Sequence, residues 1–398
     1  MSDLNRLKAW LDEGVLVSPR GEANTIVDLG RALLRVAGAG GAPLDEAPGE
    51  LVDLLGGREH LVFVLIDGLG AGLLRRCAPS GFLSGHVIGE LRSVFPSTTA
   101  AALTSFATAD YPARHGVPGW WVFLEEHDLT ATVLPYQERF SHLDLRELGV
   151  DPAHVFRQPS VLPRVERSVL SITPQAYLQD VYLRYSTGGT PAGGYEEPRG
   201  AFQRVVEHVL GAGRPTYTSV YLPHVDAAAH SQGVDSTQVR QAVNDLDDLI
   251  GWLSDRLRDA ARIVATGDHG QVPLSTERVF YLDEGDELLD LLRCPPAGEA
   301  TVPYFHVRPG QVDTFAGRFR ERFPDTFALL GPDELEELEL LGPSPLAPTT
   351  RGRIGDLVGI ASEPTALVYR RRGEDVTPHL GVHAGLTPGE MMVPLIVA

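Results

Sequence analysis

The segment Leu61-Val62-Phe63-Val64-Leu65-Ile66-Asp67-Gly68 decides the fold class of this chain. Its six consecutive apolar residues are typical of a strand that is buried on both faces, as in a parallel sheet covered by helices. An aspartate and a glycine follow where the strand must end. Three other segments are mainly apolar or β-branched on both alternating faces: Tyr217–Leu222, Arg262–Thr266 and Met392–Val397. We therefore predict an α/β fold with a mostly parallel central sheet sandwiched by helices, and we expect all four segments to run parallel in it.

Ionisable residues follow the first three of these strands. Asp67 follows the first strand, a segment from His224 to His230 follows the second, and Gly267-Asp268-His269-Gly270 follows the third. In an open α/β sheet, ligands bind outside the carboxyl ends of the strands. The sequence therefore predicts that these clusters meet at one edge of the sheet.

The candidate metal ligands combine carboxylates and imidazoles. This donor set suits borderline divalent cations, zinc first and manganese as the alternative, because calcium prefers an all-oxygen shell. Asp226 and His230 have the spacing i, i+4, which places both side chains on one face of a helix. We expect two divalent ions, held by residues from the three clusters and by a histidine just before the last strand: Asp67, Asp226, His230, Asp268, His269 and His383.

A hydroxyl-rich segment, Phe95-Pro96-Ser97-Thr98-Thr99-Ala100, precedes an apolar run that favours a helix. Backbone N–H groups at a helix N-terminus bind phosphoryl oxygens, and a nearby divalent ion makes a hydroxyl a usable nucleophile. The plainer interpretation is that Ser97 or Thr98 only caps the helix. Both interpretations can hold, because a cap needs one hydroxyl and the segment has three.

The order of these motifs resembles the alkaline phosphatase superfamily, and within it the nucleotide pyrophosphatase/phosphodiesterase branch. The resemblance covers residues of about 60–280 and 379–398. Two further phrases strengthen it, Tyr111-Pro112-Ala113-Arg114-His115-Gly116 and His383-Ala384-Gly385-Leu386. It implies an alkaline phosphatase-like fold and a metal-dependent phosphodiesterase or pyrophosphatase that hydrolyses a small, nucleotide-like phosphate ester.

The resemblance also implies roles for the candidate residues. Thr99 would be the nucleophile, with Thr98 as the fallback, and a phospho-threonine intermediate would then be hydrolysed. One zinc ion would be held by Asp226, His230 and His383. The other would be held by Asp67, Asp268 and His269, with the hydroxyl of Thr99 completing its shell.

The sequence departs from the branch beside the nucleophile. Nucleotide-cleaving members commonly have an asparagine there, whereas this chain has Ala100, Ala101 and Ala102. The backbone N–H of Thr99 and the ions would then stabilise the phosphoryl oxygen. Two nearby histidines, His115 and His224, are either substrate contacts or structural residues.

Other members of the superfamily stay open as alternatives. A sulfatase needs Cys-x-Pro-x-Arg, and Cys77-Ala78-Pro79-Ser80-Gly81 lacks the final arginine and precedes the nucleophile position. A cofactor-independent phosphoglycerate mutase relies on a lysine, and the only lysine here is Lys8. A phosphonate hydrolase, a phosphomonoesterase and a catalytically silent sensing module remain. Arg114 could hold the extra charge of a monoester or form a surface ion pair.

Changes in composition along the chain predict its domain organisation. We expect an N-terminal helical segment over 1–57, a phosphohydrolase core over 58–280 and 379–398, and a small α/β cap insertion over 281–378. Within the core, residues of roughly 122–200 are rich in turns and aromatics, which favours an excursion that covers part of the site.

Composition limits the partners and the compartment. The 398 residues carry 34 Lys+Arg and 53 Asp+Glu, a formal net charge of −19, which disfavours nucleic acid polymers and anionic membranes. Cys77 and Cys294 match no metal-binding or disulfide spacing, and we expect two buried thiols in a reducing compartment. With no secretory signal and no long apolar run, a cytoplasmic protein with a small phosphate-ester substrate is expected; the oligomeric state is left open.

Overall fold

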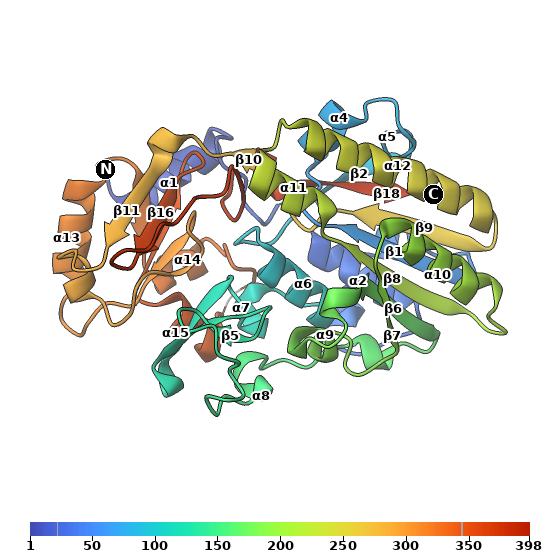
Figure 1. Cartoon of the computed structure of the whole chain (residues 1–398), viewed down its shortest axis with the longest axis horizontal. Helices are drawn as coiled ribbons and strands as arrows, with labels where there is room; N and C mark the ends of the chain where they lie inside the picture. The colour runs from blue at the N-terminus through green and yellow to red at the C-terminus, as the bar shows by residue number, and fades with distance from the viewer. Residues whose placement is uncertain (22, 344) are drawn as a thin grey trace.

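A computed structural model describes residues 1–21, 23–343 and 345–398. It has an α/β architecture in which helices cover a large central sheet, so the predicted fold class is confirmed (Figure 1). The central sheet has seven strands in this order: β2 (Val87–Arg92), β18 (Met392–Val397), β9 (Ala261–Thr266), β1 (His60–Ile66), β8 (Thr216–Leu222), β6 (Ser168–Pro174) and β7 (Ala192–Tyr195).

The parallel part of this sheet surrounds β1. Strand β1 pairs in parallel with β8 on one side and with β9 on the other. Strands β8, β6 and β7 continue the parallel pairing outward. The carboxyl ends of β1, β8 and β9 therefore lie next to one another, as the sequence predicts.

The prediction for the last strand was wrong in direction. Met392–Val397 does form a strand of the central sheet, β18, but it pairs antiparallel with β9 and β2. The physical reason is the position of His383, which lies at the edge where the parallel strands end. The chain must run back from that edge into the sheet, so it enters in the opposite direction.

The two faces of the sheet are covered by different helices. Side chains of β1 alternate between a core shared with α2 (Ile26–Val36) and α6 (Thr99–Thr108) and a core shared with α10 (Pro198–Leu210) and α12 (Thr237–Leu257). Burial on both faces explains why β1 is apolar at every position.

A second sheet combines two parts of the chain. Its seven strands are antiparallel, in this order: β14 (Phe327–Leu330), β15 (Leu357–Ala361), β13 (Pro303–Phe305), β12 (Ala297–Gly298), β3 (Trp121–Leu124), β4 (Leu129–Thr132) and β5 (Gln137–Glu138). Residues from the expected cap insertion thus share a sheet with residues of the excursion at 122–200. The excursion is only part of that range, because β6 and β7 belong to the central sheet. Ser168, Ser171 and Thr173 leave β6 without the continuous apolar run that identifies β1.

The remaining elements connect and cover the two sheets. Two small sheets pair β10 (Val272–Pro273) with β17 (Gly381–Val382) and β11 (Val279–Asp283) with β16 (Ala366–Arg370). The other helices are α1 (Asp3–Asp12), α3 (Gly49–Leu55), α4 (Ala71–Cys77), α5 (Phe82–Gly85), α7 (Pro112–His115), α8 (Pro152–Val155), α9 (Val181–Ser186), α11 (His224–Gln232), α13 (Val312–Arg322), α14 (Pro332–Glu337), α15 (Pro348–Ile354) and α16 (Pro388–Met391). Within the described residues, no helix is long and apolar enough to cross a membrane.

Candidate active site

The strand ends bring the predicted site residues together at one edge of the central sheet. Asp67 directly follows β1; its N–H donates to Leu222 O of β8 at 3.0 Å, and its carbonyl accepts from Asp226 N at 3.1 Å. Gly68 makes this approach possible. Its φ is +76°, and a Cβ there would lie 3.0 Å from the Cα of Asp226. These contacts hold the carboxyl ends of β1 and β8 next to each other at the site.

Thr99 is the first residue of α6 and faces the ionisable cluster. Its Oγ1 lies 3.1 Å from Nε2 of His269 and 3.5 Å from Oδ1 of Asp67. Thr98 occupies the N-cap position, but its hydroxyl makes no capping hydrogen bond. The Thr98 side chain lowers the pKa of the neighbouring Glu299 carboxyl, against the larger raising effect of burial. The capping interpretation of Thr98 was therefore wrong, and of the two threonines it is Thr99 whose hydroxyl lies against the ligand atoms of the cluster.

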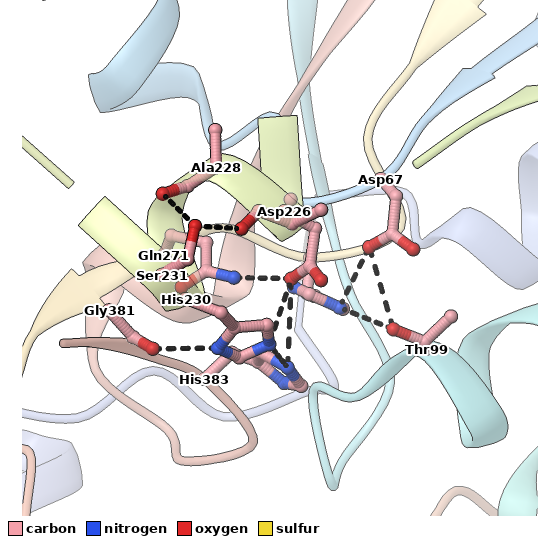
Figure 2. Close-up of polar contacts among 12 residues, drawn as sticks. Asp67, Thr99, Asp226, Ala228, His230, Ser231, Gln271, Gly381 and His383 are labelled. Carbon is pink, nitrogen blue, oxygen red and sulfur yellow. Dashed lines mark hydrogen bonds and ion pairs between the residues drawn. The ribbon is translucent and has the colours of Figure 1, made fainter. Parts of the chain in front are cut away.

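Two groups of ligand atoms form the site (Figure 2). Asp67, Asp268 and His269 each offer an atom within 4.8 Å of the others, and so do Asp226, His269 and His383. His230 completes the second group; its Nε2 lies 3.3 Å from Asp226 Oδ1 and 3.2 Å from His383 Nε2. The structure thus assembles all seven residues singled out from the sequence, whereas their division between two ions stays a prediction.

The three imidazoles are oriented in the same way. The Nδ1 atoms of His230, His269 and His383 face the carbonyls of Gly381, Gly270 and Ser97, at 2.8, 3.0 and 3.1 Å. A carbonyl can only accept, so each Nδ1 carries the proton and each Nε2 presents a lone pair to the cluster. This arrangement is typical of metal-binding histidines, whose second nitrogen donates to a protein group.

Burial and mutual repulsion shift the titration of the cluster. Burial, together with the charges of Asp268 and Asp226, raises the pKa of Asp67 well above its ordinary value. Burial also raises the pKa of Asp226 to about 6 and lowers that of His230 to about 4. The pKa of His383 falls well below its ordinary value, chiefly because of burial. The imidazoles of His230 and His383 are therefore neutral near pH 7, which is the form that binds metals.

The site fits divalent cations. Oδ2 of Asp268 is fully buried and has no hydrogen-bond partner among the described residues. Asp67, Asp226 and Asp268 form no ion pair with an arginine or lysine of the described chain; their only ion-pair partners there are histidines. A buried group of three carboxylates without an arginine or lysine partner is costly unless a cation is bound. The donor set of carboxylates and Nε2 atoms suits that cation.

Four residues beside the cluster were missed by the sequence analysis. The Tyr221 hydroxyl donates to Oδ2 of Asp67, and Nε2 of Gln271 donates to Oδ1 of Asp226. The His379 ring lies 4.1 Å from the His230 ring, and Glu299 accepts from Trp120 N at 2.8 Å. Gln271 could have been found, since it directly follows the Gly-Asp-His-Gly motif. Tyr221 carries no such signal, because it lies inside an apolar strand.

The remaining candidates lie outside the cluster. His115 is fully buried; its Nδ1 accepts from Val117 N at 3.1 Å and its Nε2 lies 3.0 Å from Ser105 Oγ, so it is structural. His224 stacks on Tyr195, with ring centroids 6.2 Å apart, and its Nδ1 is buried without a partner among the described residues. Arg114 is exposed and forms no ion pair with another described residue. The expectation of two buried thiols was wrong, because Cys77 and Cys294 are both partly exposed.

The architecture and the cluster at the strand ends define a protein of the alkaline phosphatase superfamily. The family model described as type I phosphodiesterase / nucleotide pyrophosphatase matches residues 61–386, so the chain belongs to that family. Members of this family are hydrolases that act on phosphoric ester bonds, and they depend on metals.

Individual relatives agree with this assignment. Murine ectonucleotide pyrophosphatase/phosphodiesterase 5 has a similar fold, with a TM-score of 0.62 at 15% identity over 84% of this chain and 87% of that one. The human counterpart gives a TM-score of 0.64 at 16% identity, over 85% and 87% of the two chains. A rat ectonucleotide pyrophosphatase/phosphodiesterase family member 1 is 25% identical over 50% of this chain and 22% of its own length. The chain spans about a fifth of the length of such curated relatives.

Proposed function

We propose that this protein is a metal-dependent phosphodiesterase that cleaves a small phosphate ester with Thr99 as the nucleophile. The observation that carries the proposal is the position of Thr99 Oγ1, 3.1 Å from His269 Nε2 and 3.5 Å from Asp67 Oδ1 at the N-terminus of α6. A hydroxyl beside such a ligand set is placed for activation as a nucleophile.

Two divalent ions, with zinc as the first candidate and manganese as the second, complete the proposed site. Asp67, Asp268 and His269, with the Thr99 hydroxyl, would hold one ion, and Asp226, His230 and His383 would hold the other. When bound, such ions lower the pKa of a coordinated hydroxyl and stabilise negative charge on the attacking and leaving oxygens.

The chain's own groups then perform the transfer. Oγ1 of Thr99 forms a bond to phosphorus while the bond from phosphorus to the leaving-group oxygen breaks, and water later cleaves the phosphoryl-threonine bond and restores the hydroxyl. The first N–H groups of α6 have no partner within the helix and would donate to the phosphoryl oxygens. With alanines at 100–102, these backbone donors replace a side-chain donor.

A diester is favoured over a monoester by the charges around the site. Asp67, Thr99 and Asp226 also line a cavity, and none of the described residues in its wall is a lysine, arginine or histidine. The second negative charge of a monoester would therefore find no cationic side chain in that wall, while a diester carries one charge only. The alternatives of a monoesterase and a phosphonate hydrolase become outcomes of the test.

The test compares chromogenic esters. With zinc or manganese present, bis-p-nitrophenyl phosphate is expected to turn over faster than p-nitrophenyl phosphate, and Thr99→Ala is expected to remove nearly all turnover. Thr98→Ala, the neighbouring hydroxyl, is the matched control and should keep more activity than Thr99→Ala. Diester turnover that survives Thr99→Ala, or a strong preference for the monoester, would contradict the proposal. No turnover in the metal-loaded protein would favour the silent sensing module.

Two further points belong to the proposal. An inactive threonine-to-alanine variant of the murine structural relative is known in complex with AMP, which supports a small nucleotide-like phosphate ester as ligand and a threonine as nucleophile. The charge of −19 disfavours nucleic acid polymers and anionic membranes as partners. The cytoplasmic location stays a prediction; the two free cysteines are consistent with a reducing compartment.

A further inference from the structure

A further group of metal-ligand side chains lies outside the proposed active site. Glu126, His127 and His154 each offer one ligand atom, and these atoms lie within 4.8 Å of one another. The other groups of this kind in the described part of the chain belong to the cluster at the strand ends. None of the three residues takes part in the phosphodiester chemistry proposed above, so the group needs an explanation of its own.

The group joins two segments that are distant in sequence. Glu126 and His127 lie in η2 (Glu125–His127), the short 3-10 turn that connects β3 to β4, and His154 lies in α8. Figure 1 shows α8 at the lower edge of the molecule, well away from α11, the helix that carries two ligands of the strand-end cluster. The group is therefore separate from the proposed catalytic centre.

The two rings face each other at a distance that suits one shared ion. Nε2 of His127 lies 3.1 Å from Nδ1 of His154. With Zn–N bonds of about 2.0–2.1 Å and tetrahedral angles, two nitrogens on one zinc ion lie about 3.3 Å apart. The strand-end cluster contains the same kind of contact, where Nε2 of His230 lies 3.2 Å from Nε2 of His383. A hydrogen bond between the rings would account for the distance, but not for the carboxylate beside both rings.

Both segments are held in place by contacts outside the group. The guanidinium of Arg353 donates to His154 O at 2.5 Å and to Val155 O at 2.8 Å, which fixes the end of α8. In the turn between β3 and β4, Asp128 N donates to Glu125 O at 3.2 Å. An ion would therefore bind to positions that the fold already fixes, and little conformational freedom is lost when it binds.

The donor set selects a borderline divalent cation. Two imidazole nitrogens and one carboxylate oxygen suit zinc, whereas magnesium and calcium prefer oxygen ligands. The carboxylate already has a cationic partner, because Arg157 Nη2 lies 2.5 Å from Glu126 Oε1. Both side chains of this pair reach the solvent, and exposed ion pairs stabilise little. A zinc ion held by two imidazoles as well can therefore displace the guanidinium.

We propose that Glu126, His127 and His154 form a surface zinc site. Glu126 is exposed and the two histidines are half-buried, so the group opens to solvent on one side and water supplies the fourth ligand. The ion joins the turn between β3 and β4 to α8 and stabilises this part of the protein. The proposal is independent of the phosphodiesterase activity, because no ligand is shared with the strand-end cluster.

The first experiment counts the bound ions. The protein is dialysed to equilibrium against buffered free zinc, with magnesium in excess, and its metal content is measured by elemental analysis. The unsubstituted protein is expected to hold one zinc ion per chain more than the double variant His127→Ala/His154→Ala. Equal thermal midpoints of the two proteins in EDTA check that the variant keeps its fold. Equal zinc contents, or loss of the additional ion to magnesium, would overturn the proposal.

A matched pair of glutamates tests the carboxylate ligand. Glu125 precedes Glu126 in the same turn, but it pairs with Arg293 at 2.9 Å and lies outside the ligand group. Loss of a residue that only orients a metal ligand costs about 10- to 100-fold in affinity, so Glu126→Gln should weaken zinc binding here by at least about tenfold. Glu125→Gln should leave the affinity unchanged. An equal zinc affinity of the two variants would contradict the proposed ligand set.

Hydrogen exchange locates the ion and separates this proposal from the catalytic one. Zinc is expected to slow amide exchange in residues 125–129 and 152–157 of the unsubstituted protein and of Thr99→Ala, but not in the double histidine variant. If these segments are protected and no ester is cleaved, the phosphodiesterase function fails and the surface zinc site stands. If zinc protects the strand ends alone, or protects these segments equally in the double variant, the surface site fails.

Discussion

Tyr221→Phe tests how the chain holds its metal ligands. The Tyr221 hydroxyl is buried and donates to Oδ2 of Asp67. Burial and the nearby carboxylates raise the pKa of Tyr221 well above its ordinary value, so the hydroxyl stays protonated and remains a donor throughout the neutral range. A hydrogen bond to a charged group is worth about 1.5–3 kcal/mol. Substitution of a residue that orients a metal ligand typically lowers the metal affinity by about 10- to 100-fold, which agrees with that energy.

The assay is metal competition with chelators of graded strength, monitored by metal content after gel filtration. Tyr221→Phe is expected to lose about 10- to 100-fold in affinity for one ion per chain. Tyr217→Phe is the matched control, because it removes the same atom from the same face of β8, four residues from Tyr221. Unchanged affinity in Tyr221→Phe, or an equal loss in Tyr217→Phe, would refute the assignment of Tyr221 as a positioning residue for Asp67.

Two other substitutions test the electrostatics of buried groups. Burial raises the pKa of Glu299 from 4.5 to about 7, so its contribution to the stability of the metal-free protein is fully present below pH 4.5 and is lost as the pH rises through 7. In the unsubstituted protein, the free energy of unfolding should fall through this group as the pH rises from 5 to 8. In Glu299→Gln the fall should be smaller, and the difference between the two proteins should be at most about 3 kcal/mol. Identical pH profiles of the two proteins in urea unfolding would contradict this. Arg353 is 4% exposed and donates to three backbone carbonyls, among them Val155 O at 2.8 Å. Arg353→Ala should cost about 3–5 kcal/mol in urea unfolding, against less than about 1 kcal/mol for the surface ion-pair variant Arg351→Ala; similar costs would contradict the assigned role.

The sequence predicts the centre of the parallel sheet, β9, β1 and β8, because these strands carry no regular alternation of apolar and polar residues. His60–Ile66 is such a strand, and its end locates Asp67. The strand Ser168–Pro174 is hidden for the opposite reason: Ser171 and Thr173 on one face line a cavity, so the strand has no continuous apolar run. The direction of Met392–Val397 is also invisible in its own residues, since either direction buries the same side chains.

Some residues of the candidate site could likewise be predicted from the sequence, and others could not. Asp67, Asp268 and His269 could be predicted from position, because they directly follow strands that the pattern identifies. His383 lies more than a hundred residues from the other candidates, and it was connected with them by its position just before the last strand and by the resemblance to a family. Tyr221 could not be found, because its role depends on the tertiary distance between β8 and Asp67 and not on any local pattern.

The most direct test of the central claim is to identify the residue that carries the phosphoryl group during turnover. The metal-loaded protein is mixed with a p-nitrophenyl diester, quenched in acid within the burst phase and analysed by peptide mass spectrometry. The account predicts an esterified phosphoryl group on Thr99 in the unsubstituted protein and none in Thr99→Ala. A phosphoryl group on Thr98, or turnover at full rate with no modified peptide at any time point, would contradict it.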